Sequence, residues 1–186
     1  MIKKINALLI IVASIGSIYF ALIKKEELVL FLKDISIILT INGLYIIQTI
    51  FKTKINDKLN LAYIVFIFLA HFLGVVVNLY DKIYWYDKFV HFLSGILTSF
   101  GAIYILNKNN IKMSLFFKAI FVISFSMLVA SCWEIFEFTS SCLFGVDPQK
   151  VFMTGVSDTM GDIIVAFLGS ILTALIYYLL NRYKKG

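Results

Sequence analysis

The chain has 186 residues, of which 61% are hydrophobic and 15% are charged. A soluble domain is roughly half apolar and about a quarter charged, so this composition excludes an ordinary soluble domain and indicates an integral membrane protein. The formal net charge of +6 comes from residues that flank apolar stretches. The charge therefore bears on membrane topology and does not form a nucleic-acid-binding stripe.

Six stretches of the chain are long and apolar enough to cross a membrane. A helix crosses a hydrocarbon core of about 30 Å with about 20 mostly apolar residues. We therefore expect an all-α polytopic membrane protein with six transmembrane helices, organised as one integral membrane domain over residues 1–186. The predicted helices cover residues 5–23, 28–51, 59–79, 87–106, 115–138 and 157–180.

The distribution of Lys and Arg predicts the orientation of these helices. If the N-terminus is inside, the inner segments hold eleven Lys and Arg residues and the outer segments hold six. Because positive charge favours the cytoplasmic side, both termini are expected in the cytoplasm.

Three pairs of polar residues then fall at the outer ends of the fourth, fifth and sixth predicted helices. Residues three or four apart share one face of a helix, so each pair points in one direction. All three pairs lie about one to two turns below the outer interface, and we expect them to meet in one pocket. The pairs are Asp87 with His91, Glu134 with Glu137, and Asp158 with Asp162.

Small residues continue along the same helix faces below these pairs. In lipid, small side chains let helix backbones approach closely, so helices four to six are expected to form the inner bundle, with the first three as a supporting layer. The small residues are Gly95, Thr98, Ala102, Ser126, Ala130, Ala166, Ser170 and Ala174.

The longest predicted loop, residues 139–156, is rich in apolar residues and contains Gly145, Pro148 and Gly155. Irregular backbone at membrane depth has to be covered by protein. We therefore predict that this loop is a lid or re-entrant segment over the acidic cluster.

Five carboxylates and one imidazole do not sit together charged and unpaired, so either some are protonated or a cation neutralises them. An oxygen-rich set with one imidazole suits Mg, Mn, Fe or Zn, although zinc sites usually have more histidines. Lys88 is the alternative internal cation, but an ideal helix directs its side chain about 100° away from Asp87. The predicted metal ligands are His91, Glu134, Glu137 and Asp162.

The candidate catalytic groups are the six residues of the three pairs: Asp87, His91, Glu134, Glu137, Asp158 and Asp162. The candidate substrate-binding residues are Lys88, Trp133 and Thr159, and no cofactor is expected beyond a divalent metal ion.

A purely structural interpretation of the three pairs is also open. In it, Asp87, Lys88 and Asp158 are interfacial charges, and Glu134 is hydrogen-bonded to His91 between helices. His71, in the third predicted helix, is either a hydrogen-bonded packing residue or a second imidazole of the site.

The motifs DKxxH at 87–91, WExxE at 133–137 and DTxxD at 158–162 resemble two related groups of membrane proteins. One is the VanZ-like group, associated with glycopeptide resistance, and the other is the YjdF-like bacterial inner-membrane proteins. The resemblance covers about residues 60–175. Glu137 stands where the VanZ pattern has Gln, and no Arg precedes Asp158, so the sequence is more similar to the YjdF-like group. The resemblance implies a multi-pass protein of the bacterial cytoplasmic (inner) membrane and supplies no reaction.

The sequence leaves three classes of function open, and it does not decide whether the protein is an enzyme. The first is a membrane-embedded hydrolase or transferase that acts on a lipid or lipid-linked envelope substrate. The second is a proton- or cation-coupled small-molecule transporter, although such sites are expected nearer the midplane. The third is a structural accessory subunit. The expected partners are membrane lipids and a lipid-linked substrate, with no nucleic acid.

Overall fold

The computed structural model describes residues 1–24 and 28–183. These residues form helices and connections and contain no strand, which confirms the all-α prediction. The elements are α1 (Ile2–Lys24), α2 (Leu28–Ile35), α3 (Ile37–Ile41), α4 (Gly43–Ile50), α5 (Asp57–Ile67), the π-helix η1 (Phe68–Val76), α6 (Leu79–Lys82), α7 (Tyr86–Lys108), α8 (Leu115–Phe144), α9 (Val151–Thr154) and α10 (Ser157–Tyr183). Lys25, Lys184 and Lys185, which entered the charge count, lie outside the described residues, as does the side chain of Lys33.

Five helical stretches within the described residues are long and apolar enough to span a membrane. They are Ile2–Ile23, Asp57–Val76, Tyr86–Lys108, Leu115–Phe144 and Ser157–Tyr183. The count of six and the N-in, C-in topology therefore remain predictions.

The predicted helix over residues 28–51 is divided into α2, α3 and α4. Polar side chains near the breaks bond to the helix backbone. Thr40 Oγ1 donates to the carbonyl of Ile37 over 3.2 Å, and Asn42 Nδ2 donates to that of Ile38 over 2.8 Å. Such side-chain bonds compete with the backbone hydrogen bonds of the helix and bend it, which accounts for the breaks. Hydropathy does not register these bonds, so it predicts one continuous helix.

The chain divides into two compact units, Met1–Asp87 and Lys88–Gly186, with the boundary in the first turn of α7. The first unit has its core among α1, α3, α5 and η1. His71, within η1, is hydrogen-bonded to Thr40 Oγ1 over 2.9 Å and to Ser36 Oγ over 3.2 Å. Both hydroxyl groups belong to this unit, so each ring nitrogen of His71 has a hydrogen-bond partner within it. The core residues are Ala13, Ile37, Ile41, Ile64, Phe72 and Val76.

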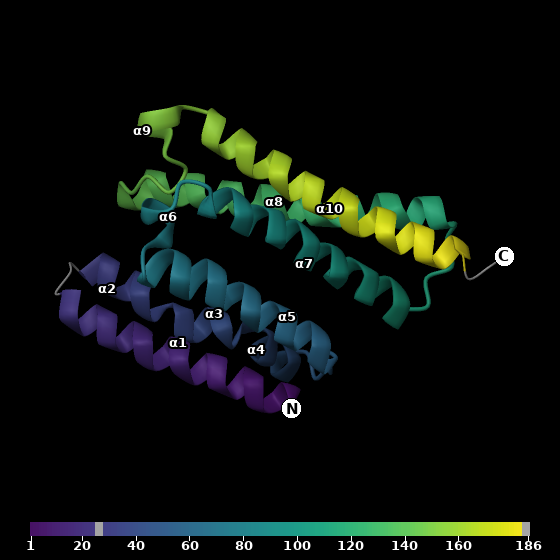
Figure 1. Ribbon diagram of the computed structural model, residues 1–186, viewed down its shortest axis with the longest axis horizontal. Helices are drawn as coiled ribbons and strands as arrows, with labels where there is room; N and C mark the ends of the chain where they lie inside the picture. The colour runs from purple at the N-terminus through teal and green to yellow at the C-terminus, as the bar shows by residue number, and fades with distance from the viewer. Residues whose placement is uncertain (25–27, 184–186) are drawn as a thin grey trace. The chain divides into compact units, whose positions relative to one another are not determined.

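The second unit is built from α7, α8, α9 and α10, and in Figure 1 α8 and α10 run side by side. The small residues predicted to pack these helices do so. A Cβ on Gly95 would overlap the carbonyl of Ala166, so α7 and α10 touch through their backbones. Ser126 on α8 is hydrogen-bonded to Thr98 Oγ1 over 2.7 Å and to the carbonyl of Gly95 over 3.2 Å. Interhelical bonds of this kind fix the register of helices in lipid.

The prediction of a loop over residues 139–156 is wrong for the first six of these residues, because α8 continues to Phe144. The hydroxyl groups of Thr139, Ser140 and Ser141 each donate to the carbonyl four residues earlier, so these polar side chains are satisfied within the helix. The helix ends at Gly145, whose φ of 66° is the left-handed conformation favoured at helix C-termini.

The connection that remains, residues 145–156, contains the short helix α9 (Figure 1). The Asp147 carboxylate accepts hydrogen bonds from the N–H groups of Val151 and Phe152, at 2.8 and 3.1 Å. These bonds satisfy backbone donors at the start of α9, so the connection has a defined structure.

Candidate functional site

Asp87 and His91 lie on the first two turns of α7. The helix is continuous from Tyr86, so their spacing of four residues places both side chains on one face. His91 is buried, and Asp87 is partly buried. Helix geometry alone therefore fixes how these two groups lie relative to each other.

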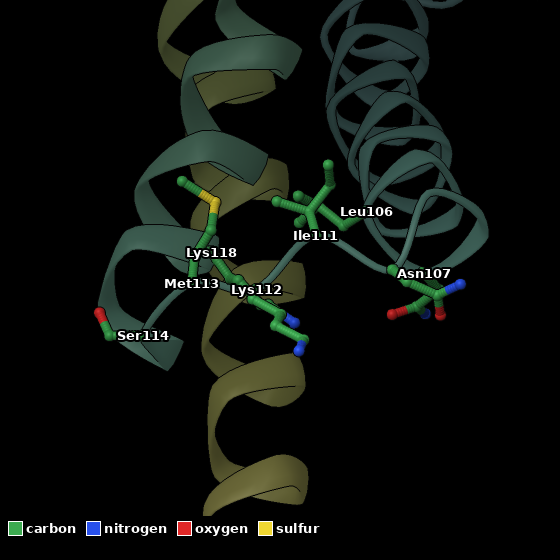
Figure 2. A pocket seen from close by; sticks show the side chains of 8 residues that line it. Leu106, Asn107, Ile111, Lys112, Met113, Ser114 and Lys118 are labelled. Atoms are coloured by element: carbon green, nitrogen blue, oxygen red, sulfur yellow. The ribbon is translucent and has the colours of Figure 1, made fainter.

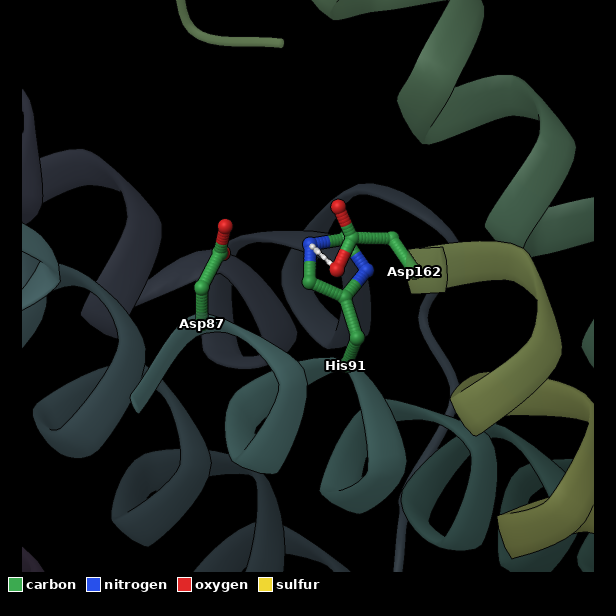
Figure 3. Close-up of side chains that lie close together, drawn as sticks. All are labelled: Asp87, His91 and Asp162. Carbon is green, nitrogen blue, oxygen red and sulfur yellow. Dashed lines mark ion pairs between the residues drawn. The ribbon is translucent and has the colours of Figure 1, made fainter. Parts of the chain in front are cut away.

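Asp162, on the second turn of α10, reaches His91. Its side chain is 3% exposed, and its Oδ1 atom lies 3.7 Å from His91 Nε2. In Figure 3 the Asp162 carboxylate lies against the imidazole, while Asp87 rises from the preceding turn of α7. One ligand atom from each residue can be chosen so that all three lie within 4.8 Å of one another. The described residues thus bring together one imidazole and two carboxylates in a geometry that a metal ion could use.

The Lys88 ammonium is a cation that lies beside the acids of this cluster. Its Nζ donates to Asp158 Oδ1 over 2.6 Å and to Asp162 Oδ1 over 2.9 Å. The helical wheel directs Lys88 away from Asp87, but its four-carbon side chain is long enough to cross to α10. Gly161 leaves the space for it, because a Cβ there would lie 2.9 Å from Lys88 Cε. The residue predicted to bind substrate is therefore paired with two of the predicted catalytic acids.

Glu134, on α8, is 6% exposed and faces the connection between α8 and α10. Its Oε2 atom and its backbone carbonyl both accept hydrogen bonds from Gln149 Nε2 at 3.1 Å. Its Oε1 atom is buried and accepts no hydrogen bond from any described residue. The carboxylate interacts electrostatically with His91 and Asp162, but it is not one of the three residues whose ligand atoms cluster.

Glu137 points elsewhere than Glu134. Its Oε1 atom accepts a 2.8 Å hydrogen bond from the indole N–H of Trp133, which is exposed. Residues three apart on a helix differ by about 60° in direction, and this difference is enough to place one acid inside and the other at the edge. Glu137 is thus outside the three-residue cluster, and Trp133 and Glu137 form a pair of their own.

Gln149 is the residue of this site that the sequence interpretation missed. It is buried, and it ties the connection over residues 145–156 to Glu134. The available signal was weak: Gln149 is the one side-chain amide among residues 145–156, directly after Pro148. Residues 145–156 thus contact one of the predicted acids, Glu134, through the side-chain amide of Gln149.

The site carries more acidic than basic groups. Four carboxylates lie within it, those of Asp87, Glu134, Asp158 and Asp162, against one ammonium and one imidazole. Taking charge out of water is expensive unless it is paired. The Lys88 ammonium offsets part of this charge by pairing with Asp158 and Asp162.

A cavity of about 720 Å³ lies at the other end of α7, beside its connection to α8 (Figure 2). Lys112, Lys118 and Asn107 are among its lining residues, which include no carboxylate and no imidazole. The lining has the charge to attract an anionic headgroup but not the groups for acid–base chemistry.

Comparison with known proteins assigns the chain to a family. Residues 5–183 match the family model described as "Predicted membrane protein (DUF2238)". The chain belongs to this family. A DUF2238 protein is a predicted membrane protein, in agreement with the five apolar helices, and the family description names neither VanZ nor YjdF.

A relative of this DUF2238 protein occurs in Thermotoga maritima. It is described as an uncharacterized protein and is 30% identical over 144 residues, which cover 76% of this chain and 71% of the relative. No solved structure matches.

Proposed function

We propose that this DUF2238 protein is a metal-dependent, membrane-embedded hydrolase or transferase. The proposed substrate is a lipid or lipid-linked envelope molecule that approaches from the outer face. The proposal also places the protein in the bacterial cytoplasmic membrane with both termini inside, as the charge distribution and the VanZ-like and YjdF-like motifs favour.

The observation that carries the proposal is the cluster of Asp87, His91 and Asp162. Metal–ligand bonds of about 2.0–2.2 Å place three ligand atoms of one ion about 3.0–3.8 Å apart. The three ligand atoms, which lie within 4.8 Å of one another, therefore have to approach by at most about 1–2 Å to bind the same ion. Two carboxylates with one imidazole fit manganese, iron or magnesium better than zinc.

A divalent ion bound there would supply a water activated as a nucleophile. The protein's own groups have the remaining roles. Lys88 can remain on Asp158 when Asp162 turns toward the ion, because the ammonium is bonded to both acids. A carboxylate outside the ligand set, Glu134 or Asp158, would hold the proton that leaves the water.

One observation favours cation-coupled transport as a second candidate. The Lys88 ammonium neutralises Asp158 and Asp162, and such a pairing is open to exchange with a proton or cation. Against it, these groups lie on the first two turns of α7 and α10, whereas a carrier's site is expected near the midplane. Two results together would support transport. The wild type would carry cations into proteoliposomes and lose this flux in Asp162→Asn, and the purified wild type would bind no divalent metal.

The test of the enzyme proposal is metal binding by purified, chelator-treated protein. We expect one Mn²⁺ or Fe²⁺ per chain in the wild type and at least about a tenfold loss of affinity in His91→Ala and Asp162→Asn. Asp81→Asn, in the short helix α6, is the matched control and should bind like the wild type. A wild type that binds no divalent ion, or binds it equally well after both substitutions, would overturn the proposal.

Activity is then tested in membranes. Cells that carry only the His91→Ala protein should accumulate one lipid species, the unprocessed substrate, relative to cells with the wild type. Identical lipid profiles in the two strains would count against an enzyme.

A further inference from the structure

A second cavity lies in the same unit, between α8, the 145–156 connection and the first turn of α10. It is a widely open depression with a volume of about 400 Å³. Three polar residues line it, Glu134, Gln149 and Thr159, among apolar residues that include Ile135, Phe138 and Val156.

The polar wall of this cavity holds a buried carboxylate oxygen that has no well-formed hydrogen bond within the described part of the chain. Glu134 Oε1 is left without one because the Gln149 amide is bound to Oε2 and the nearby Thr159 hydroxyl interacts with the carboxylate only more loosely. Asp158 also has a buried oxygen without such a bond, but its other oxygen is paired with Lys88. Buried polar atoms in proteins are almost always satisfied, so the unpaired oxygen of Glu134 points to a donor supplied by a ligand.

The charge of that donor follows from the surrounding groups. Lys88 is bonded to Asp158 and Asp162, and Glu134 forms no ion pair with any described residue. His91 already interacts electrostatically with the Glu134 carboxylate. A neutral donor would add only a hydrogen bond, whereas an ammonium would add both a hydrogen bond and a positive charge in direct contact. An anionic group would be repelled by Glu134 and Asp162.

The apolar wall indicates where the ligand comes from. Ile135, Phe138 and Val156 line the cavity and are nevertheless 63%, 60% and 69% exposed. Ile135 and Phe138 lie on the candidate membrane-spanning helix Leu115–Phe144, and Val156 directly precedes the candidate span Ser157–Tyr183. In a membrane, surface that is exposed on such helices is available to lipid. A hydrocarbon chain from the membrane can lie against them.

We propose that this cavity binds a lipid with a primary-amine headgroup, whose ammonium donates to Glu134 Oε1 and whose chain packs on Ile135, Phe138 and Val156. The inference deepens and rests on the proposed function, because it names the substrate class of that site. It assigns Glu134 to substrate binding and leaves the role of proton acceptor to Asp158.

The experiment uses nanodiscs that contain equal amounts of phosphatidylethanolamine, phosphatidylcholine and phosphatidylglycerol with identical acyl chains. Native mass spectrometry of the released protein counts the lipids that remain bound. The three headgroups separate a primary ammonium, a cation without an N–H donor and an anion with hydroxyl donors. We expect about tenfold enrichment of phosphatidylethanolamine over phosphatidylcholine, as one charge-assisted hydrogen bond would give.

Two variants locate the lipid. Glu134→Gln should abolish the enrichment, and the matched control Glu137→Gln, one turn away and bonded to Trp133, should retain it. Ile135→Trp fills the cavity from an exposed position that tolerates bulk, so it should also abolish the enrichment, even if Glu134→Gln does not fold. Equal retention of phosphatidylcholine, a preference for phosphatidylglycerol, or unchanged enrichment in Ile135→Trp would overturn the inference.

The metal content of the same samples distinguishes this inference from the proposed function. Enrichment that persists in metal-free His91→Ala protein supports the lipid site independently of the metal. A wild type that binds the metal and shows no headgroup preference overturns the lipid site alone.

Discussion

Lys88 donates a 2.9 Å hydrogen bond to Asp162 Oδ1, the same oxygen that lies 3.7 Å from His91 Nε2. One carboxylate oxygen of α10 therefore faces both an ammonium and an imidazole of α7. A metal ion at the cluster and the Lys88 ammonium would compete for this oxygen.

Replacing Lys88 by Met should consequently lower stability and raise metal affinity. Loss of its three hydrogen bonds, to the Asp158 carbonyl and to one carboxylate oxygen each of Asp158 and Asp162, should reduce the free energy of unfolding by about 1–3 kcal/mol. Removal of the competing cation should strengthen Mn²⁺ binding by about tenfold, or about 1.4 kcal/mol. Thermal unfolding in detergent and metal titration measure the two effects. Lys112→Met, at the other end of the unit, is the control, and weaker metal binding by Lys88→Met would show that the ammonium supports the site.

Replacing Gly95 by Ala should separate α7 from α10. The new methyl group would overlap the Ala166 carbonyl, and overpacking of this kind costs about 1–3 kcal/mol. Gly101 lies on the same helix with nothing within 4 Å of its Cβ position, so Gly101→Ala should be neutral or stabilising by roughly 0.5–1 kcal/mol. Unfolding by denaturant compares the two variants, and equal midpoints would contradict the close packing of α7 on α10.

Replacing Gln149 by Leu should loosen the connection between α8 and α10. The variant keeps the side-chain bulk and loses both hydrogen bonds to Glu134. We expect amide hydrogen exchange over residues 145–156 to become about tenfold faster, equivalent to about 1.4 kcal/mol of local stability. Met153→Leu, at an exposed position of α9, should exchange like the wild type. Unchanged exchange in Gln149→Leu would mean that other contacts hold the segment.

The two native cysteines test the predicted topology. Both are free and exposed: Cys142 lies near the end of α8, and Cys132 lies nearly three turns earlier in the apolar part of the helix. If both termini are in the cytoplasm, a membrane-impermeant maleimide should label Cys142 in intact cells and should not label Cys142→Ser protein. Cys132, facing hydrocarbon, should remain unlabelled in both. Labelling of Cys142 only after permeabilisation would reverse the orientation.

The sequence predicted the helical class, because this class depends on local patterns, and its small residues indicated which helix faces can approach closely, as Gly95 and Ala166 do. Hydropathy over 20 residues indicates a span, and spacing of three or four residues indicates a shared helix face. It did not predict the division of residues 28–51, nor the extension of α8 through Thr139, Ser140 and Ser141. There, hydroxyl and amide side chains bond to the backbone of their own helix, and hydropathy does not register such bonds.

The partners of each acid were decided only by the tertiary structure. Spacing predicted that Asp87 and His91 share a face of α7 and that Asp158 and Asp162 share a face of α10. The pairing of Lys88 with Asp162 depends in addition on a long flexible side chain and on the space at Gly161. The bond between Glu134 and Gln149 joins residues fifteen apart through a connection whose path has no periodic signal. Periodicity is a property of a single helix, whereas a contact between helices depends on rotamers and on the packing of several segments at once.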